Sequence, residues 1–201
     1  MDPLVGVLAL QGAFAAHERA LTRLGVATRQ VRTPEDLADV DAIVLPGGES
    51  TTMSHLLTTS GLFDMLDRRL ADGMPVLGTC AGMILLASHV LDGRADQRTF
   101  GRVDVTVRRN GYGRQVDSFE VDLDIPELAA HGLGADPFHA VFIRAPKVES
   151  VGRRAEVLAS HEGVPVLVAD GPSVVAAFHP ELTDDGRVHS LFLRRAAIVA
   201  A

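Results

Sequence analysis

Short apolar runs recur through the first half of the chain and are separated by segments with helical spacing. The runs LVGVLAL (4–10), DAIVL (41–45) and PVLGTC (75–80) have no alternating polar residues. Continuous apolar runs of this length are typical of strands that helices cover on both faces, as in a parallel sheet. The pattern therefore predicts three buried parallel strands.

Helices are expected between and after these strands, at 14–24, 61–73, 81–91 and about 187–200. In the first of them Phe14, Leu21 and Leu24 recur on one face, and Gly25 follows as a C-terminal stop. The helix expected at 81–91 is apolar on nearly every side, which indicates that it is buried.

The second half changes character. Polar and apolar residues alternate at 103–110, and the segments 138–146, 155–171 and 173–182 read as extended pieces joined by turns. We therefore expect an α/β fold, an open and mostly parallel sheet flanked by helices, with added antiparallel β segments in the second half. A chain of 201 residues suffices for one full core, so residues 1–201 are predicted to form a single domain.

Composition narrows the classes of function. A formal net charge of -7 argues against a nucleic-acid-binding surface, which needs clustered Lys and Arg. With one cysteine the chain can form neither an internal disulfide nor a cysteine-rich metal site. The start lacks the basic flank of a signal peptide, and no apolar run reaches the roughly 18 residues of a membrane span. We expect a cytoplasmic protein that binds no membrane, metal or cofactor.

The single cysteine lies in a tight turn between a predicted strand and a predicted helix. Gly78-Thr79-Cys80-Ala81-Gly82 has the form G-x-C-x-G, the thiol counterpart of the nucleophile elbow of hydrolases. A thiol there would stand at the carboxyl edge of the sheet, near a helix N-terminus that favours the thiolate. A buried, unreactive cysteine is the alternative, and the turn alone does not decide between them.

A histidine and a glutamate follow the last apolar run. In an extended segment His179 and Glu181 would point to the same side, with Pro180 limiting the backbone between them. A carboxylate next to an imidazole orients the ring and stabilises its protonated form, as in a nucleophile-base-orienter set. A solvent-exposed strand end is the alternative.

The other seven histidines rank lower as candidate bases. His17, His55 and His89 lie in predicted helices or at their ends and are expected at the surface. The remaining four, His131, His139, His161 and His189, have no acidic residue two positions along in a strand context.

A glycine pair follows the second predicted strand. In Pro46-Gly47-Gly48-Glu49-Ser50-Thr51 the two glycines let the backbone approach a ligand and expose N–H groups, and Ser50 or Thr51 could cap the next helix. Acyl transfer needs such donors where a carbonyl oxygen becomes an anion. An ordinary strand-to-helix turn is the alternative, and no lysine follows that would make it a nucleotide-binding loop.

Taken together, these three stretches resemble the class I glutamine amidotransferases. The likeness is closest to the glutaminase subunits of pyridoxal 5'-phosphate synthases. The segments that carry it are LALQGAFAAHE (8–18), LPGGESTTM (45–53), GTCAGMILLA (78–87), RNGYGRQVDSFE (109–120), VFIRAP (141–146) and FHPELTDD (178–185). They occur in the family's order and span nearly the whole chain.

The resemblance implies a role for each matching position. Cys80 would be the nucleophile, His179 the base and Glu181 its orienter, with Ala81, Gly47 and Gly48 forming the oxyanion hole. The residues implied to bind L-glutamine are Gly47, Gly48, Glu49, Arg109, Ile143 and Arg144. Gln11, Gly12 and Ala13 are implied to face the partner.

The implied partner is a barrel-shaped synthase subunit. It would use the released ammonia to build pyridoxal 5'-phosphate from ribose 5-phosphate and glyceraldehyde 3-phosphate. Two rival interpretations remain: the glutaminase of imidazole glycerol phosphate synthase, which shares the Cys, His and Glu set, and a redox-sensing module in which Cys80 is oxidised.

Overall fold

The computed structural model describes residues 3–109, 111 and 118–198. Its strands are β1 (Leu4–Leu8), β2 (Ala27–Val31), β3 (Ala42–Leu45), β4 (Val76–Thr79), β5 (Ala87–Val90), β6 (Val103–Arg108), β7 (Ser118–Leu123), β8 (Phe138–Ile143), β9 (Lys147–Val151), β10 (Glu156–His161), β11 (Val164–Asp170) and β12 (Ser173–Ala176). Its helices are α1 (Phe14–Arg23), α2 (Pro34–Leu37), α3 (Ser50–Thr59), α4 (Leu62–Ala71), α5 (Ala81–Leu86), α6 (Pro126–Ala130), the 3-10 helix η1 (Pro180–Leu182) and α7 (Arg187–Arg195).

A seven-stranded sheet forms the centre of the molecule, with strand order β10-β11-β12-β4-β3-β1-β2. The strands β2, β1, β3, β4 and β12 are parallel, and β11 and β10 add an antiparallel edge. Burial of every residue in β3, β4 and β12 explains their apolar runs. The predicted α/β fold with a mostly parallel sheet is confirmed.

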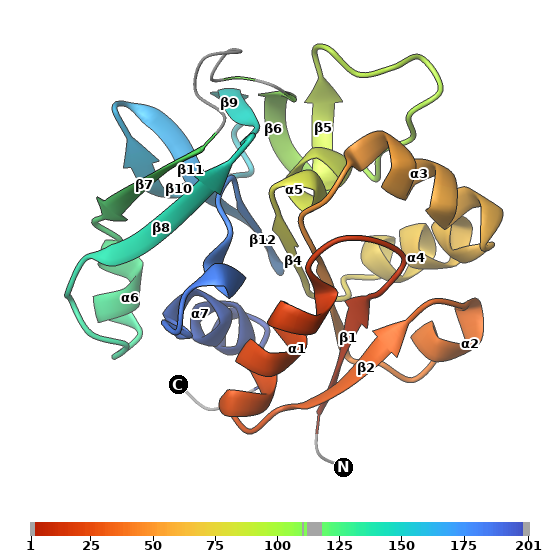
Figure 1. Cartoon of the computed structure of the whole chain (residues 1–201), viewed down its shortest axis with the longest axis horizontal. Coiled ribbons are helices and arrows are strands. Elements are labelled where there is room, and N and C mark those ends of the chain that lie inside the picture. The colour runs from red at the N-terminus through yellow and green to blue at the C-terminus, as the bar shows by residue number, and fades with distance from the viewer. Residues whose placement is uncertain (1–2, 110, 112–117, 199–201) are drawn as a thin grey trace.

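Helices cover both faces of this sheet. The chain leaves β1 in one direction, through α1 to β2, and leaves β3 in the other, through α3 and α4 to β4. Because parallel crossovers are right-handed, this reversal places α1 opposite α3 and α4. α7 lies beside α1 on the same face (Figure 1).

The reversal also decides where a site can form. In an open α/β sheet, ligands bind outside the carboxyl ends of the strands at the point where strand order reverses. The segments that follow β1, β3, β4 and β12 all leave from that edge, and they carry Gln11, Gly47, Cys80 and His179.

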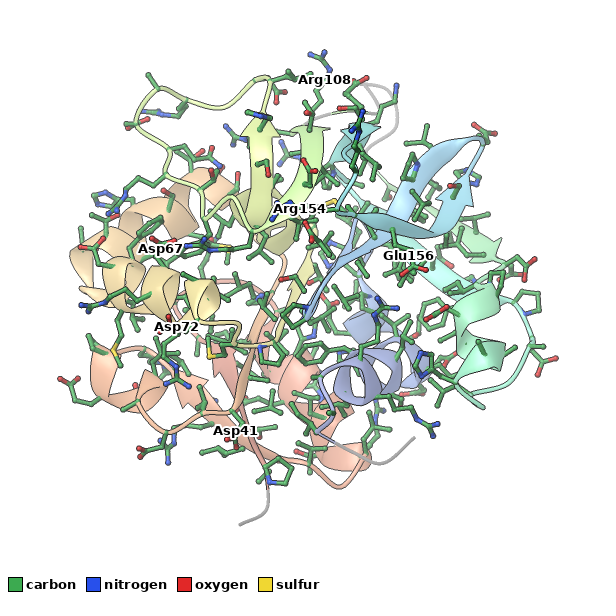
Figure 2. The ribbon with its side chains drawn as sticks, turned by 180° about the vertical axis from the view of Figure 1, so that it is seen from behind. Asp41, Asp67, Asp72, Arg108, Arg154 and Glu156 are labelled. Carbon is green, nitrogen blue, oxygen red and sulfur yellow. The ribbon has the colours of Figure 1, made fainter. Side chains whose placement is uncertain are left out.

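The added strands of the second half form two small sheets, β5-β6-β9 and the antiparallel hairpin β7-β8. Side-chain pairs attach the sheet β5-β6-β9 to the main body. Asp67 on α4, labelled in the view from behind (Figure 2), accepts a hydrogen bond of 2.5 Å from Arg102, which lies just before β6. Arg154, after β9, lies 3.3 Å from Asp170 at the end of β11.

The helix expected at 81–91 is shorter than the apolar pattern indicates. α5 ends at Leu86, and Ala87–Val90 form strand β5 instead. The carbonyl oxygens of Leu85 and Leu86 accept from the backbone N–H groups of Phe100 and Arg102, so residues outside the helix occupy its last acceptors. A pattern that is apolar on all sides fits a buried helix and a buried strand equally well.

Candidate active site

Cys80 lies at the junction of β4 and α5 with an unusual backbone. Its φ of 48° is positive, which is uncommon for a residue with a side chain. The backbone N–H donates to Ala176 O at 2.8 Å, which holds the turn against β12. Strain of this kind is found where a side chain must be held in one position, as in a nucleophile elbow.

The two glycines of the elbow are required by close packing. A Cβ on Gly82 would collide with Leu45 O, and a Cβ on Gly78 would lie 2.6 Å from Leu86 Cδ1. Both contacts would be closer than a Cβ atom approaches another heavy atom in real structures. The turn is therefore built from small residues because β3 and α5 press on both sides of it.

His179 and Glu181 meet at the same edge. Nδ1 of His179 lies 2.8 Å from Oε1 of Glu181, and the His179 N–H donates to Val141 O on β8 at 2.8 Å. The predicted pairing is confirmed, although the reason for it is different. β12 ends at Ala176, and Glu181 lies in the 3-10 helix η1 rather than in an extended segment.

Each member of this pair stabilises the charged form of the other. Burial opposes a charged imidazole, but hydrogen bonds to Cys80 and Glu181 and the Glu181 charge outweigh it, and they raise the pKa of His179 to about 10. Burial also opposes the Glu181 carboxylate, yet His17 and His179 lower its pKa below the usual range. At neutral pH a protonated imidazole thus lies within hydrogen-bonding reach of the Cys80 sulfur.

The Gly-Gly-Glu loop after β3 packs directly on these groups. A Cβ on Gly47 would collide with the His179 ring and lie 3.4 Å from Cys80 Cβ. Glu49, rather than Ser50 or Thr51, is the N-cap residue of α3, and its carboxylate accepts from the N–H groups of Thr51 and Thr52. The expectation that Ser50 or Thr51 caps this helix is therefore wrong.

Glu49 also binds the arginine that directly follows β6. Nη2 of Arg109 lies 2.7 Å from Oε1 of Glu49. Burial of Glu49 raises its pKa, but the hydrogen bonds from Thr52 and Thr51 prevail and lower it to about 2. The carboxylate is thus ionised throughout the neutral range.

A recess of about 320 Å³ lies over Cys80. It is lined by Gly48, Glu49, Ser50, Cys80, Ile84, Arg109, Ile143, Arg144 and His179. Arg144 has a φ of 46°, a second strained residue at the site, and Ile143 O lies 3.8 Å from the Cys80 sulfur. Seven of the predicted site residues therefore line one recess, namely Gly48, Glu49, Cys80, Arg109, Ile143, Arg144 and His179.

The segment after β1 lies against this loop from outside. Oε1 of Gln11 accepts from the Glu49 N–H at 3.2 Å, and Gly12, with a φ of 91°, packs on the carbonyl oxygen of Gly47. Gly12 is exposed, and Gln11 and Ala13 are partly exposed. Most of the GRQVDSFE motif, residues 113–117, lies outside the described residues.

Two histidines differ from the expectation: the sequence predicts a surface position for His17 and no role for His189. His17 on α1 and His189 on α7 are fully buried, whereas His55 and His89 are exposed as predicted. The spacing of these histidines relative to apolar residues could have identified both as buried. His17 falls three after Phe14 and four before Leu21, on the apolar face of its helix, and His189 falls three before the buried Phe192.

Fold and site together place the chain among the class I glutamine amidotransferases, in which a cysteine elbow at the carboxyl edge of a parallel sheet is backed by a histidine and a glutamate. One family within that class matches nearly the whole chain. The chain belongs to the SNO glutamine amidotransferase family, whose model matches residues 7–198.

Individual relatives agree with this family. The "Pyridoxal 5'-phosphate synthase subunit PdxT" of Mycobacteroides abscessus is 57% identical over 96% of this chain and 97% of its own. The protein of the same name from Herpetosiphon aurantiacus is 54% identical over 94% of this chain and 98% of its own. A solved structure described as a glutamine amidotransferase superposes with a TM-score of 0.88, at 44% identity over 96% of this chain and 98% of that one.

Proposed function

We propose that this chain is the glutaminase subunit of a pyridoxal 5'-phosphate synthase, hydrolysing L-glutamine to L-glutamate and ammonia. The observation that carries the proposal is the Cys80 elbow, with its thiol within reach of a His179 that Glu181 holds at 2.8 Å. The names of the relatives favour this pathway over imidazole glycerol phosphate synthase. The family match speaks against a redox sensor.

The reaction begins at the thiol. The Cys80 thiolate attacks the side-chain carboxamide carbon of glutamine, and the tetrahedral intermediate collapses as His179 protonates the departing ammonia. His179 then takes a proton from water, whose oxygen attacks the thioester carbon. Glutamate leaves and the thiolate is restored, so one water is consumed for each ammonia released.

Backbone N–H groups would hold the oxyanion of both tetrahedral intermediates. Ala81 is the first residue of α5, where a helix leaves its N–H groups without partners inside the helix. Gly47 O faces Gly12, and because a trans peptide points its C=O and N–H in opposite directions, the Gly48 N–H faces away from Gly12. Ala81 and the Gly47-Gly48 peptide thus supply the donors.

The mouth of the recess carries the charges that an amino acid needs. We assign the α-carboxylate of glutamine to the guanidinium groups of Arg109 and Arg144, which both line the recess. The Glu49 carboxylate suits the α-ammonium group. The backbones of Gly47, Gly48 and Ile143 complete the glutamine site.

The released ammonia must be used in a second reaction. We assign that reaction to the barrel-shaped synthase subunit, which joins the ammonia to ribose 5-phosphate and glyceraldehyde 3-phosphate. The exposed segment Gln11-Gly12-Ala13 is the surface we assign to this partner. It contacts Glu49 and Gly47, so a partner bound there would press on the loop that forms the oxyanion hole.

The deciding experiment is glutamate release from L-glutamine by the purified chain, alone and with the cognate synthase subunit. We expect strong stimulation by the synthase and no release by Cys80→Ala in either case. Activity that ignores the synthase would contradict the assigned pathway. Turnover by Cys80→Ala would contradict the assigned nucleophile.

A further inference from the structure

Behind Glu181, three polar side chains are buried that the chemistry above does not use. They are His17 on α1, Thr79 at the end of β4 and His189 on α7, each 0% exposed. They are absent from the lining of the recess, so they do not contact bound glutamine. Burying polar groups is costly unless they are paired, which makes their mutual contacts informative.

These side chains form a continuous path to the catalytic carboxylate. His189 Nε2 lies 2.9 Å from His17 Nδ1. His17 Nε2 in turn lies 3.2 Å from Thr79 Oγ1 and 3.3 Å from Glu181 Oε2. Since Oε1 of Glu181 binds His179, the two oxygens of one carboxylate face two different imidazoles.

The carboxylate selects the protonation of His17. If Nε2 carried no hydrogen, its lone pair would face a carboxylate oxygen at 3.3 Å, which is repulsive. Nε2 therefore carries the hydrogen, directed at Thr79 Oγ1 and lying beside Oε2, an oxygen that has no aligned hydrogen bond of its own within the described residues.

The tautomer of His189 follows from that of His17. Nδ1 of His17 must accept, so Nε2 of His189 donates to it. This leaves a bare lone pair on His189 Nδ1, the ring nitrogen that lacks a partner in the part of the chain the structure describes. Burial lowers the pKa of both imidazoles, that of His189 to about 3, so both are neutral.

We propose that His17, fixed by His189 and Thr79, is a positioning residue of the glutaminase site: its Nε2–H supports the ionised form and the orientation of Glu181. The proposal rests on the triad assigned above. His17 touches neither substrate nor thiol, and it acts through Glu181 on His179. Sequence spacing places the two histidines on separate helices, and the fold brings them together behind the triad.

Removing this N–H should change the pKa of Glu181 in one direction only. The titratable and charged groups around Glu181 are His179 and His17 at its two oxygens, and His189 one step further. Arg19, Arg23 and Asp184 line a small surface recess together with Glu181, and Arg23 pairs with Asp184 there. Loss of the His17 N–H withdraws support from the charged carboxylate, so the pKa of Glu181 rises. The acid limb of the kcat/KM profile then moves to higher pH.

The test compares His17→Met with His17→Gln in the complex with the synthase subunit. A glutamine side chain can place an N–H near the position of Nε2, whereas methionine fills similar volume without a donor. For His17→Met we expect kcat to fall about tenfold to a hundredfold, with KM for glutamine little changed and the acid limb shifted upward. His17→Gln should recover most of the loss.

Two results would overturn the proposal: wild-type kcat and acid limb in His17→Met, or an equal loss in His17→Gln, which would mean that only packing matters. Should His17→Met not fold, His189→Met gives a second route, because it frees the tautomer of His17. It should lower kcat severalfold and move the acid limb in the same direction, and an unchanged profile would count against the idea.

Controls separate this proposal from the triad itself. His131→Gln alters a histidine paired with Glu127 on α6 and should keep wild-type kinetics. If Cys80→Ala still releases glutamate, the assigned site is wrong. If Cys80→Ala is inactive while His17→Met behaves as wild type, the site stands and only the positioning role is lost.

Discussion

The guanidinium of Arg109 lies 2.7 Å from the carboxylate of Glu49, although 60 residues separate them. The pair joins the turn after β6 to the loop after β3, and both side chains line the recess over Cys80. Glu49 is anchored through three further hydrogen bonds from Thr51 and Thr52. The arginine is therefore held in place before any substrate arrives, which reduces the entropy lost on binding.

Replacing Arg109 should weaken glutamine binding more than chemistry. We expect Arg109→Met to raise KM about tenfold to a hundredfold with a smaller change in kcat, because one charged hydrogen-bond partner of the substrate is lost. Arg108→Met is the matched control, since that neighbouring side chain pairs with Glu149 outside the recess. Steady-state kinetics with varied glutamine decides, and an unchanged KM in Arg109→Met would refute the assigned contact.

The strained backbone of Cys80 gives a prediction about stability. At a φ of 48° a glycine is relaxed, whereas alanine keeps the strain of the native residue. Cys80→Gly should therefore have a higher free energy of unfolding than Cys80→Ala, by about 1 kcal/mol. Urea denaturation of the two inactive variants measures this difference. An alanine variant as stable as the glycine variant would show that the elbow is unstrained.

Much of the architecture could be predicted from the sequence, because parallel strands buried on both faces leave uninterrupted apolar runs. β1, β3 and β4 were found in this way. β2, with its sequence ATRQV, was not, since it lies at the sheet edge and only Val31 is fully buried. The end of α5 was also missed, because tertiary hydrogen bonds from Phe100 and Arg102 determine it.

The site, like the fold, combines features that the sequence predicts with features that it does not. The Cys80 elbow and the His179–Glu181 pair are local motifs, so spacing identifies them. The Glu49–Arg109 pair and the His17–His189 contact join residues far apart in the sequence, and only the sheet order brings them together. Glu49 gave no capping signal because the Ser50 and Thr51 that follow it are stronger N-cap candidates.

Gly47 should be more important for activity than for stability. A Cβ at this position would collide with the His179 ring, which would have to turn away from Glu181. We expect Gly47→Ala to lower kcat more than tenfold, because the base loses its orientation. Glutamate release at saturating glutamine measures the effect, and thermal unfolding checks that the fold persists.

A second glycine provides the control for Gly47. Gly186, before α7, has a φ of -79° that alanine adopts, and its added Cβ would lie 3.3 Å from a flexible Leu24 methyl. Gly186→Ala should keep wild-type kcat. Equal activity in the two alanine variants would mean that the imidazole tolerates the added methyl group.

The buried His189 should make stability depend on pH. Its pKa is lowered to about 3 in the folded protein, chiefly by burial, against about 6.5 in an unfolded chain. Between these values the unfolded chain binds more protons than the folded one, so the free energy of unfolding falls as pH drops from about 6.5 toward 3. One such group contributes a slope of at most about 1.4 kcal/mol per pH unit.

The variant His189→Leu isolates this contribution from that of the other titrating groups. Urea denaturation at pH 7, 6, 5 and 4 should give a shallower loss of stability for His189→Leu than for wild type. Val188→Ala, at a buried neighbour on the same helix, should lower stability by a similar amount at every pH, because no proton is involved. Parallel curves for wild type and His189→Leu would show that the pKa of His189 is the same in the folded and unfolded chains, and the predicted resistance of this buried imidazole to protonation would then be wrong.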